Sequence, residues 1–131
     1  MLRCELLPRF YETDGLGHIN NTVVPKWFET ARTPIFKIFN PELSLDQWNL
    51  ILRKIDVEFI AQTYHEYPVE VRSWVSHVGN TSFTVSHELW QRDEMTASGT
   101  AVLVYFDYNA QQKGVIPEHC RRALKEIVKE G

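Results

Sequence analysis

The chain has 131 residues, the size of one domain, and its formal net charge is −3 without a visible basic stripe, so nucleic acid is not expected as the main partner. No apolar run approaches the length that crosses a bilayer, and the first residues lack the layout of a signal peptide. Cys4 and Cys120 lie at opposite ends of the chain, which favours reduced thiols. We therefore expect one cytoplasmic domain over residues 1–131.

The first half of the chain predicts one strand and one long helix. Residues 2–11 read as the strand. One helix face is then indicated by apolar residues at helical spacing: Val23, Val24, Trp27, Phe28 and Ala31. Asn20 and Asn21 are suitable N-caps, so the helix is expected to begin near Asn21 and to run to about Phe39. Pro34 removes one backbone hydrogen bond and is expected to bend or split it.

The second half predicts consecutive strands. β-branched and aromatic residues are enriched in four segments separated by short turns, at residues 50–62, 69–78, 82–91 and 95–108. Strands joined in this way favour an antiparallel meander. Pro117 stands in the first turn of a terminal helix over residues 117–130. Together these elements predict an α+β fold, in which an antiparallel sheet of about five strands wraps a long central helix.

The segment before the central helix carries the densest chemistry. Gly15 and Gly17 adopt positive φ without steric cost, so the chain can turn tightly there. The first N–H groups of a helix lack internal partners and suit a partial negative charge on a substrate oxygen. Asp14 lies a few residues upstream. A carboxylate beside such N–H groups is an arrangement for acyl transfer, although an Asp in a Gly-rich turn more often bonds its own backbone.

This segment also carries a family resemblance. D-G-L-G-H-I-N-N at residues 14–21 and W-F-E-T-A-R at residues 27–32 resemble the signature of the 4-hydroxybenzoyl-CoA thioesterase-like acyl-CoA thioesterases, which have the hotdog fold. Their pattern is D-x-x-G-H-V-N-N followed by a helix with Y-F-E-x-A-R. Shorter matches extend the resemblance over nearly the whole chain. It implies an acyl-CoA thioester hydrolase that releases a carboxylic acid and free coenzyme A.

The resemblance implies roles for individual residues. Asp14 matches the catalytic aspartate, which acts as nucleophile or as general base for water. The backbone N–H of Asn21 matches the amide that polarises the thioester carbonyl. The positions implied in loop shape or substrate binding are Gly17, His18, Asn20, Val24, Trp27, Asn80, Thr81 and Ser82. Glu29 matches a helical Glu of the motif, and we interpret it as a structural ion-pair or hydrogen-bond partner.

Two departures from the family pattern concern binding. Val24 stands where the family has Tyr, which implies an acyl pocket that is larger or differently shaped. Gly79, Asn80 and Thr81 stand where members often carry Arg or Lys for the coenzyme A phosphates. The residues that hold those phosphates, and the length of the acyl chain, are therefore not predicted.

Several alternatives remain at this stage. An acyl-carrier-protein thioesterase has similar motifs, but usually has Asn where Leu16 stands. A hotdog hydratase is a weaker match, since its histidine follows the acid by five positions and His18 follows Asp14 by four. A non-catalytic acyl-binding module would keep the same scaffold.

Cofactors and partners complete the expectations. The thioester is already activated, so neither a metal nor an organic cofactor is expected. His65, His77 and His87 fit no zinc motif and are interpreted as sheet or surface residues. The resemblance implies a homodimer or homotetramer in which each active site lies at a subunit interface.

Overall fold

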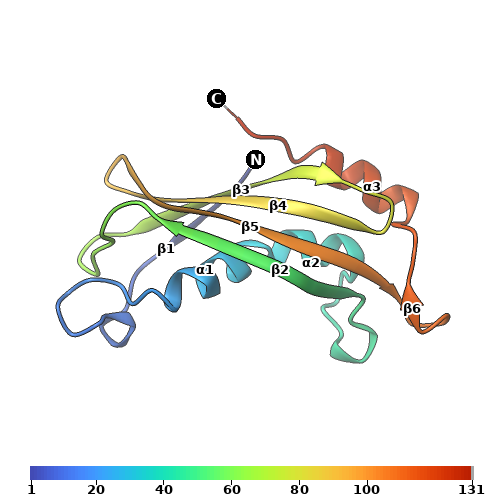
Figure 1. Ribbon diagram of the computed structural model, residues 1–131, viewed down its shortest axis with the longest axis horizontal. Helices are drawn as coiled ribbons and strands as arrows, with labels where there is room; N and C mark the ends of the chain where they lie inside the picture. Colours follow the sequence, from blue (N-terminus) through green and yellow to red (C-terminus); the bar gives the residue numbers. More distant parts are fainter. Residues whose placement is uncertain (131) are drawn as a thin grey trace.

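The computed structural model describes residues 1–130, which form one antiparallel sheet with helices against it (Figure 1). The strand order is β1-β3-β4-β5-β2, and the short β6 pairs with β5. The strands are β1 (Leu2–Leu6), β2 (Leu50–Phe59), β3 (Val69–Val78), β4 (Ser82–Gln91), β5 (Glu94–Asp107) and β6 (Gln112–Lys113). The helices are α1 (Val23–Ala31), α2 (Thr33–Phe39) and α3 (Glu118–Lys125), with 3-10 turns η1 (Phe10–Glu12) and η2 (Leu45–Gln47).

The α+β arrangement expected from the sequence is confirmed, and the central helix is divided into two, as was expected of Pro34, so it is not one long helix. It consists of α1, with 9 residues, and α2, with 7 residues, which meet at Arg32. Pro34 lies in the first turn of α2, where its missing N–H leaves no bond unmade. The helix also begins at Val23 rather than near Asn21, and its N-cap position is Thr22.

The strand order corrects the expected meander. β3, β4 and β5 do follow one another, and Arg92 and Asp93 take the positive φ angles of a tight hairpin turn between the last two. β2, however, pairs with β5 on the far edge instead of with β3. Two elements are shorter than expected. The first strand ends at Leu6, before the chain forms η1, and the terminal helix α3 ends at Lys125. β6 was not expected.

The core lies between α1, α2 and the concave face of the sheet. Alternate residues of β4 are buried, among them Phe83, Val85 and Leu89, and they face the apolar sides of the two helices. Burial of each such side chain contributes about 1.5–3 kcal/mol. α3 adds Cys120 and Leu124 to the cluster around α2. The helices are thereby fixed against the sheet, and the start of α1 has a defined position.

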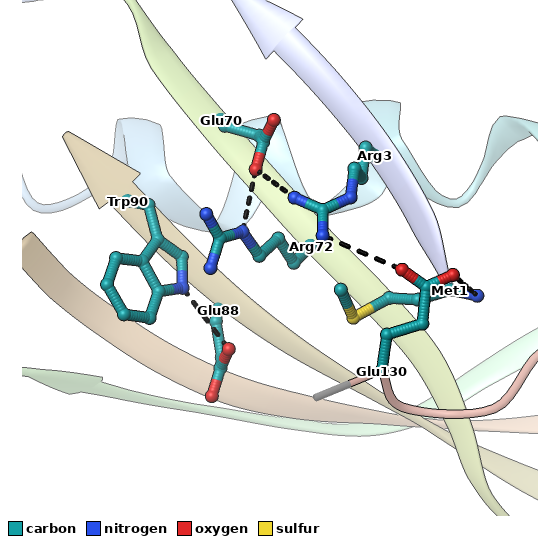
Figure 2. Close-up of polar contacts among 7 residues, drawn as sticks. All are labelled: Met1, Arg3, Glu70, Arg72, Glu88, Trp90 and Glu130. Atoms are coloured by element: carbon teal, nitrogen blue, oxygen red, sulfur yellow. Dashed lines mark hydrogen bonds and ion pairs between the residues drawn. The ribbon is translucent and has the colours of Figure 1, made fainter. Parts of the chain in front are cut away.

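Charged residues on the outer face tie the two chain ends to β3 (Figure 2). Arg3 of β1 pairs with Glu70 at 2.9 Å and with Glu130 at 3.6 Å, and Arg72 donates to Glu70 at 2.6 Å. The neighbouring guanidinium of Arg72 lowers the pKa of Glu70. Exposed pairs of this kind contribute about 0–1 kcal/mol each, so they fix the register of β1 more than they stabilise the fold.

The two sheet edges differ in how they are covered. β1 pairs with residues 69–73 of β3, and the N–H of Val75 then donates to the carbonyl of Ile127 at 2.9 Å, so the C-terminal segment covers β3 where β1 ends. β2 has no neighbour on its outer side among residues 1–130. None of the helices in this part of the chain is long and apolar enough to cross a membrane.

Candidate active site

A cavity of about 490 Å³ opens between the segment that precedes α1 and the segment that follows β2. Four residues predicted from the sequence line it: Asp14, Asn20, Asn21 and Val24. The opposite wall is residues 59–63, which the sequence analysis did not single out. These residues are the last of β2 and the loop after it, and only the strand order brings them to Asp14. A local sequence pattern carries no signal for such a long-range contact.

The Asp14 carboxylate is held at the mouth of a tight turn. Gly15 and Gly17 have φ angles of 89° and 84°, as the sequence analysis required of them. The Asp14 N–H donates to the carbonyl of His18 at 2.8 Å, and one Asp14 oxygen accepts the N–H of Leu16 at 2.9 Å. The other oxygen lies 3.7 Å from Nδ1 of His18. Asp14 is therefore a turn former, and its second oxygen remains directed at the imidazole.

The loop after β2 supports this turn through backbone pairing. The N–H of Ile19 donates to the carbonyl of Thr63 at 2.8 Å, and the N–H of His65 donates to the carbonyl of Gly17 at 3.3 Å. The rings of His18 and Tyr64 meet edge to face at 5.3 Å. Gly17 and His18 thus shape the loop below the cavity and are not among its lining residues.

A buried glutamine anchors the supporting loop to the sheet. Gln91 ends β4 and is 5% exposed. Its Oε1 accepts the N–H of Tyr64 at 2.8 Å, and its Nε2 donates to the carbonyls of Tyr64 at 2.6 Å and Tyr67 at 3.0 Å. Because Tyr64 pairs with His18, this side chain links the Asp14 turn to the rigid part of the sheet.

The two asparagines before α1 have different surroundings. The side-chain oxygen of Asn20 accepts both the N–H and the hydroxyl of Thr22 at 2.9 Å, so Asn20 closes the turn that leads into the helix. Within residues 1–130, no oxygen accepts a hydrogen bond from the N–H of Asn21. Asn21 lines the cavity, so this amide is available to an oxygen atom placed there.

Trp27 and Glu29 lie apart from this cavity. Trp27 is buried, its indole N–H donates to Glu12 at 3.1 Å, and it lines a separate hollow beside β1. Glu29 is exposed and, in the described part of the chain, forms no ion pair or side-chain hydrogen bond, contrary to the role we expected.

Asn80, Thr81 and Ser82 are also not brought to Asp14 within one chain. They lie at the turn between β3 and β4. Thr81 and Ser82 line a shallow depression together with Arg53 and Lys113. In this depression two of the expected substrate-binding residues meet basic side chains.

A polar network crosses the core under α1. Nη1 of Arg32 lies 3.1 Å from Nε2 of His87, and Nδ1 of His87 lies 2.7 Å from the hydroxyl of Ser73. A guanidinium only donates, so Nε2 accepts and Nδ1 carries the proton. Burial, and to a smaller extent the charge of Arg32, lower the pKa of His87 from 6.5 to about 3. His87 is therefore a residue of the sheet, as expected, and it is a neutral residue of the core. Residues 1–130 contain no cluster of three or more metal-ligating side chains.

Comparison with known proteins identifies the class. The model of the thioesterase-like superfamily matches residues 8–124, and the chain belongs to this superfamily. A predicted thioesterase from Bacillus stearothermophilus is 38% identical, with a TM-score of 0.94 over 99% of this chain and 98% of that one. A thioesterase from Thermus thermophilus, solved in complex with coenzyme A and Zn, is 25% identical, with a TM-score of 0.85 over 96% and 92%. No curated protein matches. The hotdog fold is thus confirmed, and membership supports thioester hydrolysis as the reaction.

Proposed function

We propose that the protein hydrolyses acyl-CoA thioesters and that Asp14 and the N–H of Asn21 carry the reaction. The observation that carries this proposal is that both residues line one cavity, and that the N–H of Asn21 has no hydrogen-bond acceptor within residues 1–130. The thioester oxygen would accept a hydrogen bond from this amide. Negative charge that develops on the oxygen would then be stabilised by a dipole already in place.

Two routes lead from this geometry to the products. In the first, an Asp14 oxygen attacks the carbonyl carbon, the C–S bond breaks, the coenzyme A thiolate leaves and takes a proton from water, and a second water hydrolyses the mixed anhydride. In the second, Asp14 takes a proton from a water that attacks the same carbon, the C–S bond breaks, and the leaving coenzyme A thiolate takes that proton from Asp14. Neither route needs a metal or an organic cofactor. His18, at 3.7 Å from Asp14, would orient the carboxylate in both.

We also propose that the active unit is an oligomer built along β2. This edge strand exposes Ile51, Ile55 and Phe59, which are 48%, 46% and 51% exposed, and a bare edge strand is a template for pairing. A two-fold axis would place the start of the partner's β2 beside the end of this one. The depression with Arg53, Thr81 and Ser82 lies at the start of β2, and the Asp14 cavity lies at its end. Each copy would then place its own β2 beside the edge that carries the other's cavity, in a cytoplasmic dimer or tetramer.

The test is free-thiol release from a panel of acyl- and aryl-CoAs by the native protein and Asp14→Asn. Asn keeps the shape and removes the charge, so kcat is expected to fall by about two orders of magnitude or more without a matching rise in KM. Asp46→Asn, on the exposed turn η2, is the matched control and should leave both constants unchanged. Equal activity of native protein and Asp14→Asn would show that Asp14 is not in the chemical step.

An acyl-carrier-protein thioester is the second candidate substrate. No Arg or Lys is among the residues that line the Asp14 cavity. The contacts that one chain offers a substrate there are therefore to the acyl and thioester groups, which coenzyme A esters and carrier-protein esters have in common. The same assay with a carrier-protein thioester separates the two. Tight binding of acyl-CoA without release from either substrate would instead favour a non-catalytic acyl-binding module.

A further inference from the structure

A second cavity, of about 120 Å³, lies between α1 and β2. Its walls are largely apolar and include Phe28, Leu52, Ile55 and Val57. It adjoins the Asp14 cavity along both elements. On α1, Val24 lines the first cavity, and Phe28, one helical turn later, lines the second. On β2, Phe59 lines the first cavity, and Val57, which lies on the same side of the strand, lines the second. A chain that enters beside Asn21 can therefore continue between α1 and β2.

Arg32 lies at the far end of the path that an acyl chain would follow between α1 and β2, and it has no ion-pair partner within residues 1–130. Its side chain lines the second cavity, yet the residue is only 3% exposed. Nη1 bonds to the neutral His87, and Nε is buried without a hydrogen-bond partner. No Asp or Glu of residues 1–130 forms an ion pair with it. Buried charges in proteins are normally paired, because an unpaired one loses its hydration without compensation.

None of the charged groups around the cavity forms an ion pair with Arg32 in residues 1–130, although the charge of Glu29 acts on it from a distance and partly offsets the lowering of the Arg32 pKa by burial. Glu29, three positions before Arg32, lines the cavity but is exposed to solvent, and Asp56 accepts the hydroxyl of Thr100. Lys26, the remaining charged residue on the wall, is a second cation. An anion that enters the cavity would meet a buried guanidinium with an unused donor, while Glu29 and Asp56 lie on exposed parts of the wall.

We propose that this second cavity binds the distal end of the acyl group and that Arg32 recognises a carboxylate there, so that the substrate class is ω-carboxyacyl thioesters. The inference rests on the proposed thioesterase function. The eleven positions from Asn21 to Arg32 span about 16 Å along the helix. The Arg32 side chain leans back toward the start of the helix, so an acyl chain has to cover about 12 Å between the Asn21 amide and the guanidinium. At about 1.2 Å per bond along an extended chain, this corresponds to about eight to ten carbons.

The test compares two non-hydrolysable thioether analogues of coenzyme A that have the same ten-carbon chain, one ending in a carboxylate and the other in a methyl group. Dissociation constants are measured by titration calorimetry. The native protein is expected to bind the carboxylate analogue at least about tenfold more tightly, since hydrogen bonds to a charged group are the strong ones. In Arg32→Met, this preference is expected to disappear or reverse.

The controls distinguish a binding role from a structural one. Lys37→Met removes the same charge from the exposed side of α2 and should keep the preference. If Arg32 had only a structural role, Arg32→Met would weaken the binding of both analogues by the same factor. The comparison in the native protein decides even if that variant does not fold. Equal affinities of the native protein for the two analogues would overturn the proposed carboxylate subsite. Glu29 or a second copy of the chain would then already supply the anion, for instance. The thioesterase proposal would not be affected. Failure of both analogues to bind would overturn both the carboxylate subsite and the proposal that the substrates are coenzyme A esters.

Discussion

His87 is a titratable group enclosed by the core, and this makes stability depend on pH. The unfolded chain takes up a proton near pH 6.5, whereas the folded chain does so only near the lowered pKa of about 3. Between these values the unfolded state binds more protons, so the free energy of unfolding falls as the pH falls. The slope contributed by one such group approaches about 1.4 kcal/mol per pH unit.

Replacement of the imidazole tests this prediction. His87→Gln keeps an acceptor for Arg32 and a donor for Ser73 but cannot titrate, so urea unfolding between pH 4 and pH 6.5 should show a shallower pH dependence, by about one proton. His77→Gln, on an exposed part of β3, should retain the native slope. Parallel curves for the native protein and His87→Gln would contradict the prediction.

At the scale of residues, the sequence identified the local chemistry and missed the distant partners. Asp14, Gly15 and Gly17 form a tight turn because their conformations depend on their own neighbours in sequence. Trp27 was expected to line the acyl site, yet its indole N–H donates to Glu12 and the residue lines a separate hollow beside β1. Helical spacing gives the apolar face of α1 but not which sheet residue each side chain meets.

The loop after β2 depends on one side chain for its position. In Gln91→Met the chain keeps a similar volume but leaves the backbone groups of Tyr64 and Tyr67 without their partners. The free energy of unfolding is expected to fall by about 1–3 kcal/mol, the usual cost of leaving buried polar groups unsatisfied.

Hydrogen exchange localises this effect. Amide exchange in residues 61–67 and in the paired residues 17–19 should accelerate in Gln91→Met more than exchange in β4 and β5, because the loop would open without global unfolding. Gln47→Met, on the exposed turn η2, is the control and should exchange like the native protein. A uniform increase across the sheet would show that Gln91 supports the whole fold rather than this loop.

At the scale of elements, periodicity located the strands and the helices but not their neighbours. β3 and β4 have the expected bounds, and alternation of buried and half-buried residues persists along β4 but only through the first half of β3, before the irregularity between Val75 and His77. The pairing of β2 with β5 was not predicted, because the chain between β2 and β3 is long enough to cross the sheet and short-range patterns do not record where it goes. The residues opposite Asp14 depend on that pairing.

At the scale of the whole molecule, β2 is an edge strand with no neighbour on its outer side within residues 1–130, and the oligomer proposed along it has a direct test. Ile51 is 48% exposed on β2 and lines neither the Asp14 cavity nor the cavity beside Arg32, although it borders the depression with Arg53 and Ser82. Recovery of activity on association therefore separates a loss of assembly from a local change in that depression. Ile51→Lys places a charge on the edge, which is how natural sheets prevent edge-to-edge pairing. Analytical ultracentrifugation is expected to show a dimer or tetramer for the native protein and a dissociation constant raised at least about tenfold for Ile51→Lys.

Activity measured on the same samples links the assembly to the site. If the partner completes each site, thioester hydrolysis by Ile51→Lys should fall at concentrations where the variant is monomeric and return where it associates, because the cavity with Asp14 and Asn21 is unchanged within each chain. Leu45→Lys, at an apolar position of η2 that is 83% exposed, controls for added charge and should neither dissociate nor lose activity. A native protein that is monomeric at all concentrations, or a monomeric variant with full activity, would show that a single chain holds the complete site.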